Sequence, residues 1–281
     1  MRYGIMRCGM KNQMIYATAL LVLAIPGLLG GVRPAKAEAP PTPATIGQTW
    51  TRPKDGAEMV AVPAGEFTMG SNDPEIFMTP SRPQRQVTLD GYWIDKNLVT
   101  VAQYRKFCKA TGRKMPDPPE WGWKDDHPVV NVTWYDAKVY CDWAGASLPT
   151  EAQWEKAARG TDGRAFPWGN QWDATKANSL ESRLQATTPV GSYPEGASPY
   201  GALDMAGNVW EWCADYYGKD YYKSAPARNP TGPRSGEGRV QRGGSWGDSL
   251  ELPFRCAYRH YDVPGYRYLI VGFRCALRAD G

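Results

Sequence analysis

Glycine and proline recur along the whole chain, with 30 glycines and 24 prolines among 281 residues. Both residues interrupt helices and strands, so long regular elements are excluded over most of the sequence. The aromatic residues are mainly Trp (12) and Tyr (16), against only 6 Phe. Trp and Tyr bury apolar area while keeping a hydrogen-bonding tip, which suits a core with many irregular backbone groups. The sequence therefore predicts a turn-rich domain and excludes a helical bundle.

The first 37 residues are typical of a secretory signal. Basic residues precede an apolar run over 15–32, and Ala35-Lys36-Ala37 places small residues at the two positions that specify cleavage. We predict a signal peptide over 1–37, cleaved before Glu38, and a periplasmic or secreted protein. The alternative is an uncleaved membrane anchor, which the short run and Pro26 disfavour.

The net charge excludes nucleic acid as a partner. The whole chain has 33 Lys and Arg against 29 Asp and Glu. Five of those bases lie in 1–37, which holds no acid, so the remaining 28 bases face 29 acids. No basic stripe is left to bind phosphates.

A polar, proline-rich tether is predicted over 38–57, followed by one domain over 58–281. Met59–Pro63 reads as a strand followed by a turn at Ala64-Gly65. Two further strands, 86–89 and 92–94, flank a turn at Asp90-Gly91. After residue 160 the sequence predicts mainly loops and short strands.

Three helices have clear start and stop signals. Thr100, Thr133 and Thr150 are predicted N-caps, and Gly112, Gly145 and Gly160 the respective ends. The apolar spacing predicts the buried faces of the first two helices, which are Val101, Tyr104, Phe107 and Cys108, and Trp134, Ala137, Tyr140 and Cys141.

The chain resembles the formylglycine-generating enzyme (sulfatase-modifying factor) family. The matching motifs occur in the family's order and are Val62–Gly70, His127–Trp134, Leu148–Glu155, Phe166–Asn170, Gly207–Trp212, Arg242–Trp246 and Gly272–Cys275. The resemblance implies an α+β, C-type-lectin-like fold with little regular secondary structure and three short helices packed on small twisted sheets.

The resemblance also implies where chemistry would occur, and this chain departs from it there. In the enzyme, two cysteines after the Gly-Gly-Ser motif bind copper(I) and oxidise a sulfatase cysteine. Here Asp248 occupies the first position and the second has no counterpart. Because copper(I) requires soft thiolates, we expect no copper and no formylglycine generation. Ser245 and Trp210 match residues near the family's active site.

Relatives without the cysteine pair suggest other chemistry. The ergothioneine-pathway sulfoxide synthases bind iron on three histidines, but this chain has only 2, so such a site is not expected. The PvdO-type pyoverdine-maturation proteins are similar in being exported single domains of comparable length. They provide the best enzymatic analogy, which rests on architecture and not on a shared catalytic motif.

The family's calcium sites imply two structural metal positions. Asp204 and Glu211, with the carbonyls of Gly207 and Val209, would supply hard oxygen ligands, or would form a turn without metal. A second site would use Asn178 and the carbonyl of Ser179, with Glu181 as a substitute acid.

The resemblance implies a disulfide between Cys141 and Cys275. Cys256 matches half of another family bridge whose partner position is Ala158 here, so Cys213 is the substitute partner, and Cys108 is left as a core thiol. Exported proteins commonly carry such bonds.

Polar residues gather in sequence around the loop that follows Ser245. Asp248 and His260 are candidate acid–base groups, with Ser245 and Trp210 beside them. The alternative is a surface with no catalytic role. Arg255 and Arg259 belong either to this pocket or to structural ion pairs.

Two classes of function remain open. The first is an exported maturation factor that acts oxidatively on a peptide-like substrate, as an oxidoreductase. The second is a non-catalytic module that binds a protein, glycan or envelope component, or an accessory factor for an exported metalloenzyme. A catalytic site predicts acid–base groups in a deep cleft, whereas a binder predicts a shallow aromatic surface. The sequence does not indicate an oligomeric state.

Overall fold

The computed structural model describes residues 39–74 and 81–278. The predicted signal peptide over 1–37 lies outside the described residues. Those that are described belong to one compact unit. Across 39–74 and 81–278, no helix is long and apolar enough to cross a membrane.

Helices α1 (Val101–Thr111), α2 (Trp134–Ala144) and α3 (Glu151–Arg159) confirm the predicted helices. Each begins at its predicted threonine with a complete capping box, and each ends at its predicted glycine. Those glycines have positive φ angles of 71°, 74° and 71°, a region that favours glycine. The predicted faces of α1 and α2 are buried.

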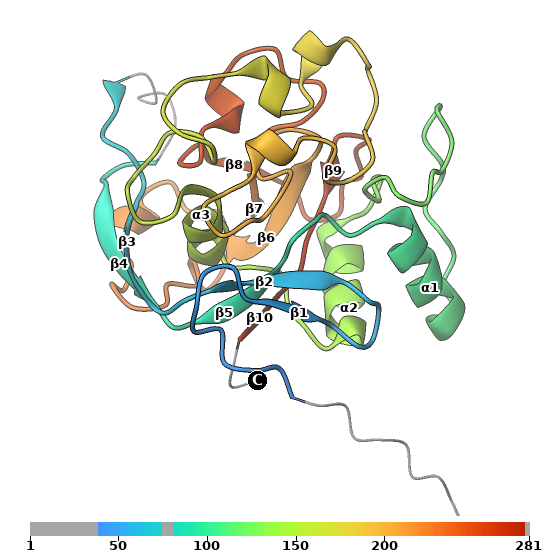
Figure 1. The fold of residues 1–281 in the computed structure, drawn as a ribbon, viewed down its shortest axis with the longest axis horizontal. Helices are drawn as coiled ribbons and strands as arrows, with labels where there is room; N and C mark the ends of the chain where they lie inside the picture. The colour runs from blue at the N-terminus through green and yellow to red at the C-terminus, as the bar shows by residue number, and fades with distance from the viewer. Residues whose placement is uncertain (1–38, 75–80, 279–281) are drawn as a thin grey trace, which may run out of the picture. The chain divides into compact units, whose positions relative to one another are not determined.

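Three small sheets complete the α+β fold (Figure 1). The first is antiparallel with the strand order β1-β2-β5-β10, and the second is the hairpin β3-β4. The third has the order β8-β7-β6-β9, in which β6 and β9 run parallel. The strands are β1 (Thr49–Thr51), β2 (Glu58–Val62), β3 (Gly65–Met69), β4 (Arg85–Leu89), β5 (Tyr92–Asp95), β6 (Trp210–Tyr216), β7 (Arg239–Arg242), β8 (His260–Asp262), β9 (Val271–Gly272) and β10 (Ala276–Arg278).

Short 3-10 turns occupy the long stretch between α3 and β7, as the turn-rich composition predicts. They are η2 (Ala174–Lys176), η3 (Leu180–Ser182), η4 (Pro194–Gly196) and η5 (Tyr221–Lys223), and η6 (Leu252–Phe254) follows β7.

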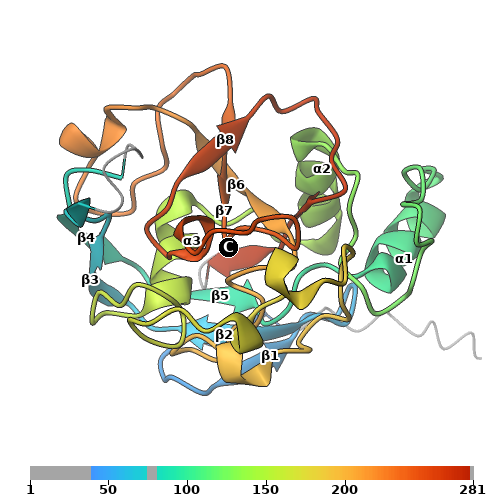
Figure 2. The same ribbon diagram turned by 90° about the horizontal axis from the view of Figure 1, so that it is seen from above.

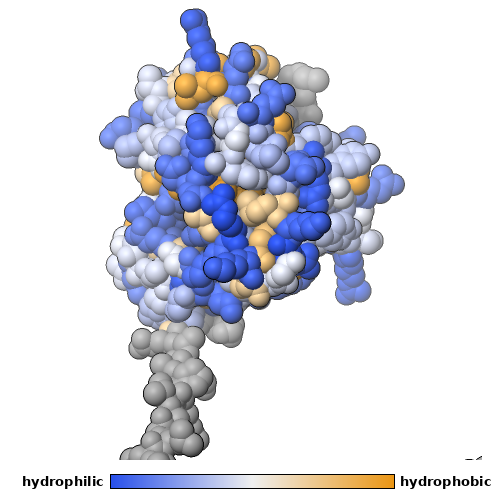
Figure 3. Space-filling model, turned by 90° about the vertical axis from the view of Figure 1, so that its right-hand side faces the viewer, coloured by the Kyte–Doolittle hydropathy of each residue, from blue (hydrophilic) through white to orange (hydrophobic). Residues whose placement is uncertain are grey.

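Helix α3 lies among the sheets, whereas α1 and α2 lie together at one side (Figures 1 and 2). It contacts the β3-β4 hairpin and also β6 and β7. All nine of its residues are buried, including its four charged ones. The face on the α1 side is largely hydrophilic, with apolar side chains in a strip near its centre and in smaller patches elsewhere (Figure 3).

One prediction about the N-terminal half was wrong. The stretch 38–57 is not wholly a tether, because β1 pairs with β2. Arg52 is 2% exposed and binds Asp55 and Asp95 at 2.7 and 2.8 Å. A buried arginine needs such partners, and they join this stretch to the domain.

The two strands predicted on either side of the Asp90-Gly91 turn are present as β4 and β5. The strands on either side do not form a hairpin, because β4 pairs with β3 whereas β5 pairs with β2 and β10. The turn therefore carries the chain from one sheet to another. Asp90 is held there by Asn229, whose Nδ2 donates to Oδ2 at 2.6 Å.

Candidate functional site

The turn after β7 holds Ser245 and Asp248 together. The backbone N–H and the hydroxyl of Ser245 both donate to Oδ2 of Asp248, at 2.9 and 2.7 Å. Ser245 is fully buried, whereas Asp248 is partly exposed. Asp248, which stands at the expected position of the first cysteine, therefore stabilises its own turn through these two hydrogen bonds.

Gly244 makes this turn possible. It adopts φ 72°, and a Cβ there would lie 2.6 Å from the ring of Phe254. A larger residue would separate the turn from η6, so the glycine has a packing role as well as a conformational one.

Trp210 and His260 form the second pair of predicted site residues. Trp210 begins β6 and His260 begins β8, two strands of the same sheet. Their ring centroids lie 5.2 Å apart, and the ring of Tyr258 lies 6.0 Å from that of Trp210. His260 stays exposed to solvent on its other side.

The two pairs lie within electrostatic range of each other. Partial burial lowers the pKa of His260 below its usual value, while the carboxylates of Asp262 and Asp248 act in the opposite direction. Asp248 also contributes to the raised pKa of Tyr258, after burial. The structure thus brings together the four predicted residues, with Tyr258 as an addition that sequence reasoning missed.

Buried ion pairs hold the segment that carries Tyr258 and His260 against α3. Arg242 pairs with Glu155 and donates to the carbonyl oxygens of Cys256, at 2.9 Å, and Tyr258. Arg259 binds Glu151 through two hydrogen bonds of 2.6 and 2.8 Å. Charge-assisted bonds of this kind fix geometry strongly.

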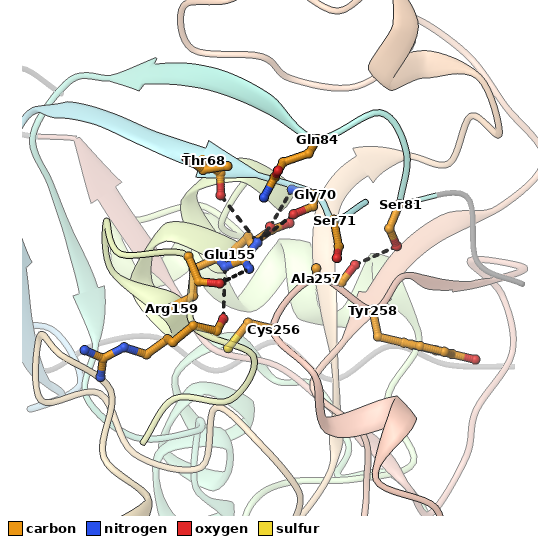
Figure 4. A network of polar contacts seen from close by, with 12 residues as sticks. Thr68, Gly70, Ser71, Ser81, Gln84, Glu155, Arg159, Cys256, Ala257 and Tyr258 are labelled. Atoms are coloured by element: carbon orange, nitrogen blue, oxygen red, sulfur yellow. Dashed lines mark hydrogen bonds and ion pairs between the residues drawn. The ribbon is translucent and has the colours of Figure 1, made fainter. Parts of the chain in front are cut away.

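Figure 4 shows how Glu155 extends this network to β3. One of its oxygens accepts from the N–H of Gly70 at 2.7 Å and from Arg159 at 2.8 Å. Ser81 donates to the carbonyl of Ala257 at 2.7 Å. The two bonds from Arg259 to Glu151 confirm that Arg259 belongs to a structural ion pair. The same holds for Arg255, which pairs with Asp73 at 2.7 Å.

The sequence did not reveal that Glu151 and Glu155, the two acids of α3, are buried. The capping box predicted the helix, but charged residues on a short helix normally face water. Their burial depends on Arg242 and Arg259, which are distant in sequence. The only signal was the arginine that opens the Arg242–Trp246 motif.

The donors at the candidate site do not fit copper(I) or a three-histidine iron centre. The turn offers the oxygens of Asp248 and Ser245 instead of two thiolates. His127, the second histidine, is 6% exposed and its Nδ1 lies 2.9 Å from the Thr187 hydroxyl. Among the described residues, no three His, Cys, Asp or Glu side chains cluster as metal ligands.

The predicted calcium donors around Glu211 are already engaged. Both oxygens of Glu211 accept from Arg274, at 2.6 and 3.0 Å, and both side chains are fully buried. Asp204 accepts from the N–H of Gly191 at 2.7 Å. The carbonyls of Gly207 and Val209 alone are too few for the six to eight ligands that calcium takes. In this arrangement Glu211 binds arginine in place of a metal, and the calcium site stays a prediction.

The second predicted calcium position is likewise occupied by protein groups. The side-chain oxygen of Asn178 accepts from the Ser182 hydroxyl at 2.9 Å, and the carbonyl of Ser179 accepts from the Ser182 N–H at 3.0 Å. Glu181, the substitute acid, accepts from the indole of Trp172 at 3.2 Å. This segment is a hydrogen-bonded turn.

The five cysteines among the described residues are free thiols in the structure. Cys141 and Cys275 lie as predicted, one on α2 and one beside β10, with sulfur atoms 3.2 Å apart but unbonded. Cys213 and Cys256 are also free and fully buried, so the structure does not make their predicted bond. Burial raises the pKa of Cys256 to about 12, which keeps it an inert thiol.

Comparisons with known proteins agree with this fold. Residues 45–279 match the model of the sulfatase-modifying factor enzyme 1-like domain. The formylglycine-generating enzyme of Mus musculus is 34% identical over 80% of this chain and 76% of its own length. The hercynine oxygenase of Mycolicibacterium smegmatis is 31% identical over 80% of this chain and 62% of its own length.

A solved structure gives the same result. PvdO from Pseudomonas aeruginosa superposes with a TM-score of 0.73 and 30% identity, covering 83% of this chain and 98% of PvdO. The motifs, the fold and the matches agree, and the chain belongs to the family of sulfatase-modifying factor enzyme 1-like domains.

Proposed function

We propose that the chain oxidises a peptide-like substrate at the surface formed by Ser245, Asp248, Trp210, Tyr258 and His260, as an exported maturation factor of the PvdO type. The observation that carries this proposal is the contact between the rings of Trp210 and His260 at the start of β6 and β8, with the Asp248 carboxylate on the neighbouring turn acting on the same imidazole. The family relatives, which include an oxygenase, support an oxidative activity.

The proposed reaction is a two-electron oxidation with dioxygen as the acceptor. The substrate loses two electrons and two protons, and dioxygen takes both and leaves as hydrogen peroxide. His260 accepts a substrate proton, since its lowered pKa keeps the imidazole neutral near pH 7. Asp248 lies where it stabilises the imidazolium that forms.

Oxygen uptake by the purified protein tests this proposal. Peptides that contain an oxidisable aromatic residue are supplied with and without the protein, and dioxygen loss and peroxide formation are recorded together. We expect one peroxide for each dioxygen consumed and a loss of rate in His260→Ala. Uptake that is unchanged in His260→Ala, or no uptake with any peptide, would contradict the proposed reaction.

A non-catalytic binding module is the second candidate, and one observation favours it. Three exposed tyrosines follow His260 in the sequence. Tyr261 is 48% exposed, Tyr266 55% and Tyr268 36%. This is the shallow aromatic surface expected of a binder. Retention of a peptide without oxygen uptake, lost in Tyr266→Ala, would support this function instead.

A further inference from the structure

A hollow in the protein surface lies beside the candidate site and is lined by none of the residues of that site. Its volume is about 570 Å³. One short segment, which ends in η2, forms it; the lining residues are Trp168, Gly169, Asn170, Gln171, Trp172, Asp173, Ala174 and Lys176. We propose that this hollow binds a pyranose unit of a glycan.

Two partly exposed tryptophans form its aromatic surface. Trp172 stacks on Phe254 with ring centroids 4.6 Å apart and planes 15° apart, and Trp168 stacks on Phe166 at 5.6 Å and 10°. Both phenylalanines are buried. Each indole therefore has one face covered by the core, while it still lines the hollow.

The indoles are fixed before any ligand arrives. Trp168 donates its N–H to the carbonyl of Gln171 at 2.9 Å, and Trp172 donates to Glu181 at 3.2 Å. Neither ring needs a ligand to satisfy its polar atom, and neither is free to collapse into the hollow. Such preorganisation reduces the entropy lost on binding.

Hydrogen-bond donors and hydrogen-bond acceptors both surround the two indole rings. Asp173 accepts from the N–H and hydroxyl of Thr175, at 3.0 and 2.6 Å, and these bonds lower the pKa of its carboxyl, which stays ionised as an acceptor. Asn170 and Gln171 are exposed amides, and the Lys176 ammonium lies 3.5 Å from Asp173.

This combination matches the chemistry of a sugar ring. The C–H face of a pyranose packs on an aromatic face, and its hydroxyls need donors and acceptors around the edge. An apolar side chain would leave the polar rim without partners, which is costly. An anionic ligand such as a phosphate would be repelled by Asp173.

The inference does not depend on the oxidation proposed above. The two sites are nevertheless neighbours, because Glu181 binds Trp172 and the N–H of Leu180 donates to the carbonyl of Asp248 at 3.0 Å. A glycan held here would lie beside the candidate reaction site.

Fluorine NMR of the full chain labelled with 5-fluorotryptophan tests the site. Trp168→Phe and Trp172→Phe assign the two resonances, and the probes are cellobiose, maltose and N,N′-diacetylchitobiose. Because a single-sugar site binds weakly, titrations extend to about 20 mM. We expect at least one disaccharide to shift both resonances in a saturable way.

Three variants make the result decisive. Trp172→Phe keeps a ring on Phe254 and should weaken binding about tenfold, equivalent to about 1.4 kcal/mol. Gln171→Ala, which keeps the carbonyl that holds Trp168, should weaken it two- to fivefold, on the scale of about one neutral hydrogen bond. Trp121→Phe is the matched control, because that half-buried indole packs against Trp246 outside the hollow.

The proposal is overturned by any of four results. No disaccharide shifts the two resonances, or the shifts persist with the same affinity in Trp172→Phe and Gln171→Ala, or Trp121→Phe weakens binding as much as they do. A proline-rich peptide that binds where no sugar does would also overturn it. Failure here leaves oxygen uptake unaffected, so the two proposals fail separately.

Discussion

The segment from Ser245 to His260 has two halves with opposite environments. Residues 249–251 are exposed, and Leu250 is 69% exposed. Residues 254–257 are buried, and buried arginines hold the backbone carbonyls of Cys256 and Tyr258. The comparison indicates that contacts of the buried half hold this segment in the fold, whereas side chains in the exposed half can be replaced without loss of those contacts. Asp248, which stands where the resemblance places the first cysteine, is half-buried and directly precedes the exposed half.

The largest expected effect comes from breaking the buried half. Arg242→Met removes one of the two cations that pair with buried Glu155, together with the donors to the carbonyls of Cys256 and Tyr258, so the free energy of unfolding in urea should fall by about 3–5 kcal/mol. Arg105→Met is the matched control, because Arg105 is 47% exposed in its pair with Asp125 and exposed pairs contribute about 1 kcal/mol or less. Equal losses in the two variants would contradict the comparison.

Stability measured against pH tests the buried network around α3 at Asp215, which is buried beside Glu151. Burial, followed by the charge of Glu151, raises the pKa of Asp215 from 3.8 to about 8. The folded protein keeps this proton where the unfolded chain releases it, so Asp215 makes stability fall as pH rises from about 4 to 8.

Asp215→Asn should therefore remove this fall. Asparagine can still accept the N–H of Glu151, which donates to Asp215 at 2.9 Å. At pH 8 we expect the variant to be more stable than the wild type by about 1–3 kcal/mol, with little difference near pH 4. Urea unfolding across this range measures the slope, and a parallel pair of profiles would refute the assignment.

The turn that precedes the exposed half should tolerate change with a smaller loss of stability. Asp248→Ala removes the acceptor of two hydrogen bonds from buried Ser245, so we expect a loss of about 1–3 kcal/mol. Asp248→Asn keeps an acceptor at the same place and should lose less. A loss as large as that of Arg242→Met would show that the turn belongs to the rigid scaffold.

Calcium removal has the smallest expected effect. Because Arg274 already occupies both oxygens of Glu211, treatment with EDTA should change Tm by less than about 1 °C, well below the shift that a loss of 1 kcal/mol produces. A fall of several degrees, reversed by added calcium, would show that Arg274 yields Glu211 to the metal.

The sequence predicted the local parts of the fold well and the long-range parts poorly. Thr100, Thr133 and Thr150 marked all three helices because capping is decided within four residues. It missed β1 and the partners of Arg52, because pairing with Asp95 joins residues 43 apart. The strands on either side of the Asp90-Gly91 turn were predicted, but the sequence did not show that they pair in different sheets.

The candidate site shows the same division. Ser245, Asp248 and Trp210 could be named because they lie in or next to family motifs, and His260 because polar residues gather in sequence near that loop. In the structure Ser245 binds Asp248, and Trp210 contacts His260. The engagement of Glu211 by Arg274 could not be read from the sequence, since a carboxylate that binds arginine and one that binds calcium look alike there. Tyr258 was missed because only the pairing of β7 and β8 turns it toward Trp210.

Mass spectrometry of a cysteine peptide from a sulfatase, incubated with the copper-loaded protein under air, tests the central claim most directly. The turn after Gly244 offers oxygen donors in place of paired thiolates, so we predict that the cysteine returns unchanged with and without copper. Conversion of that cysteine to formylglycine only when copper is present would contradict the account.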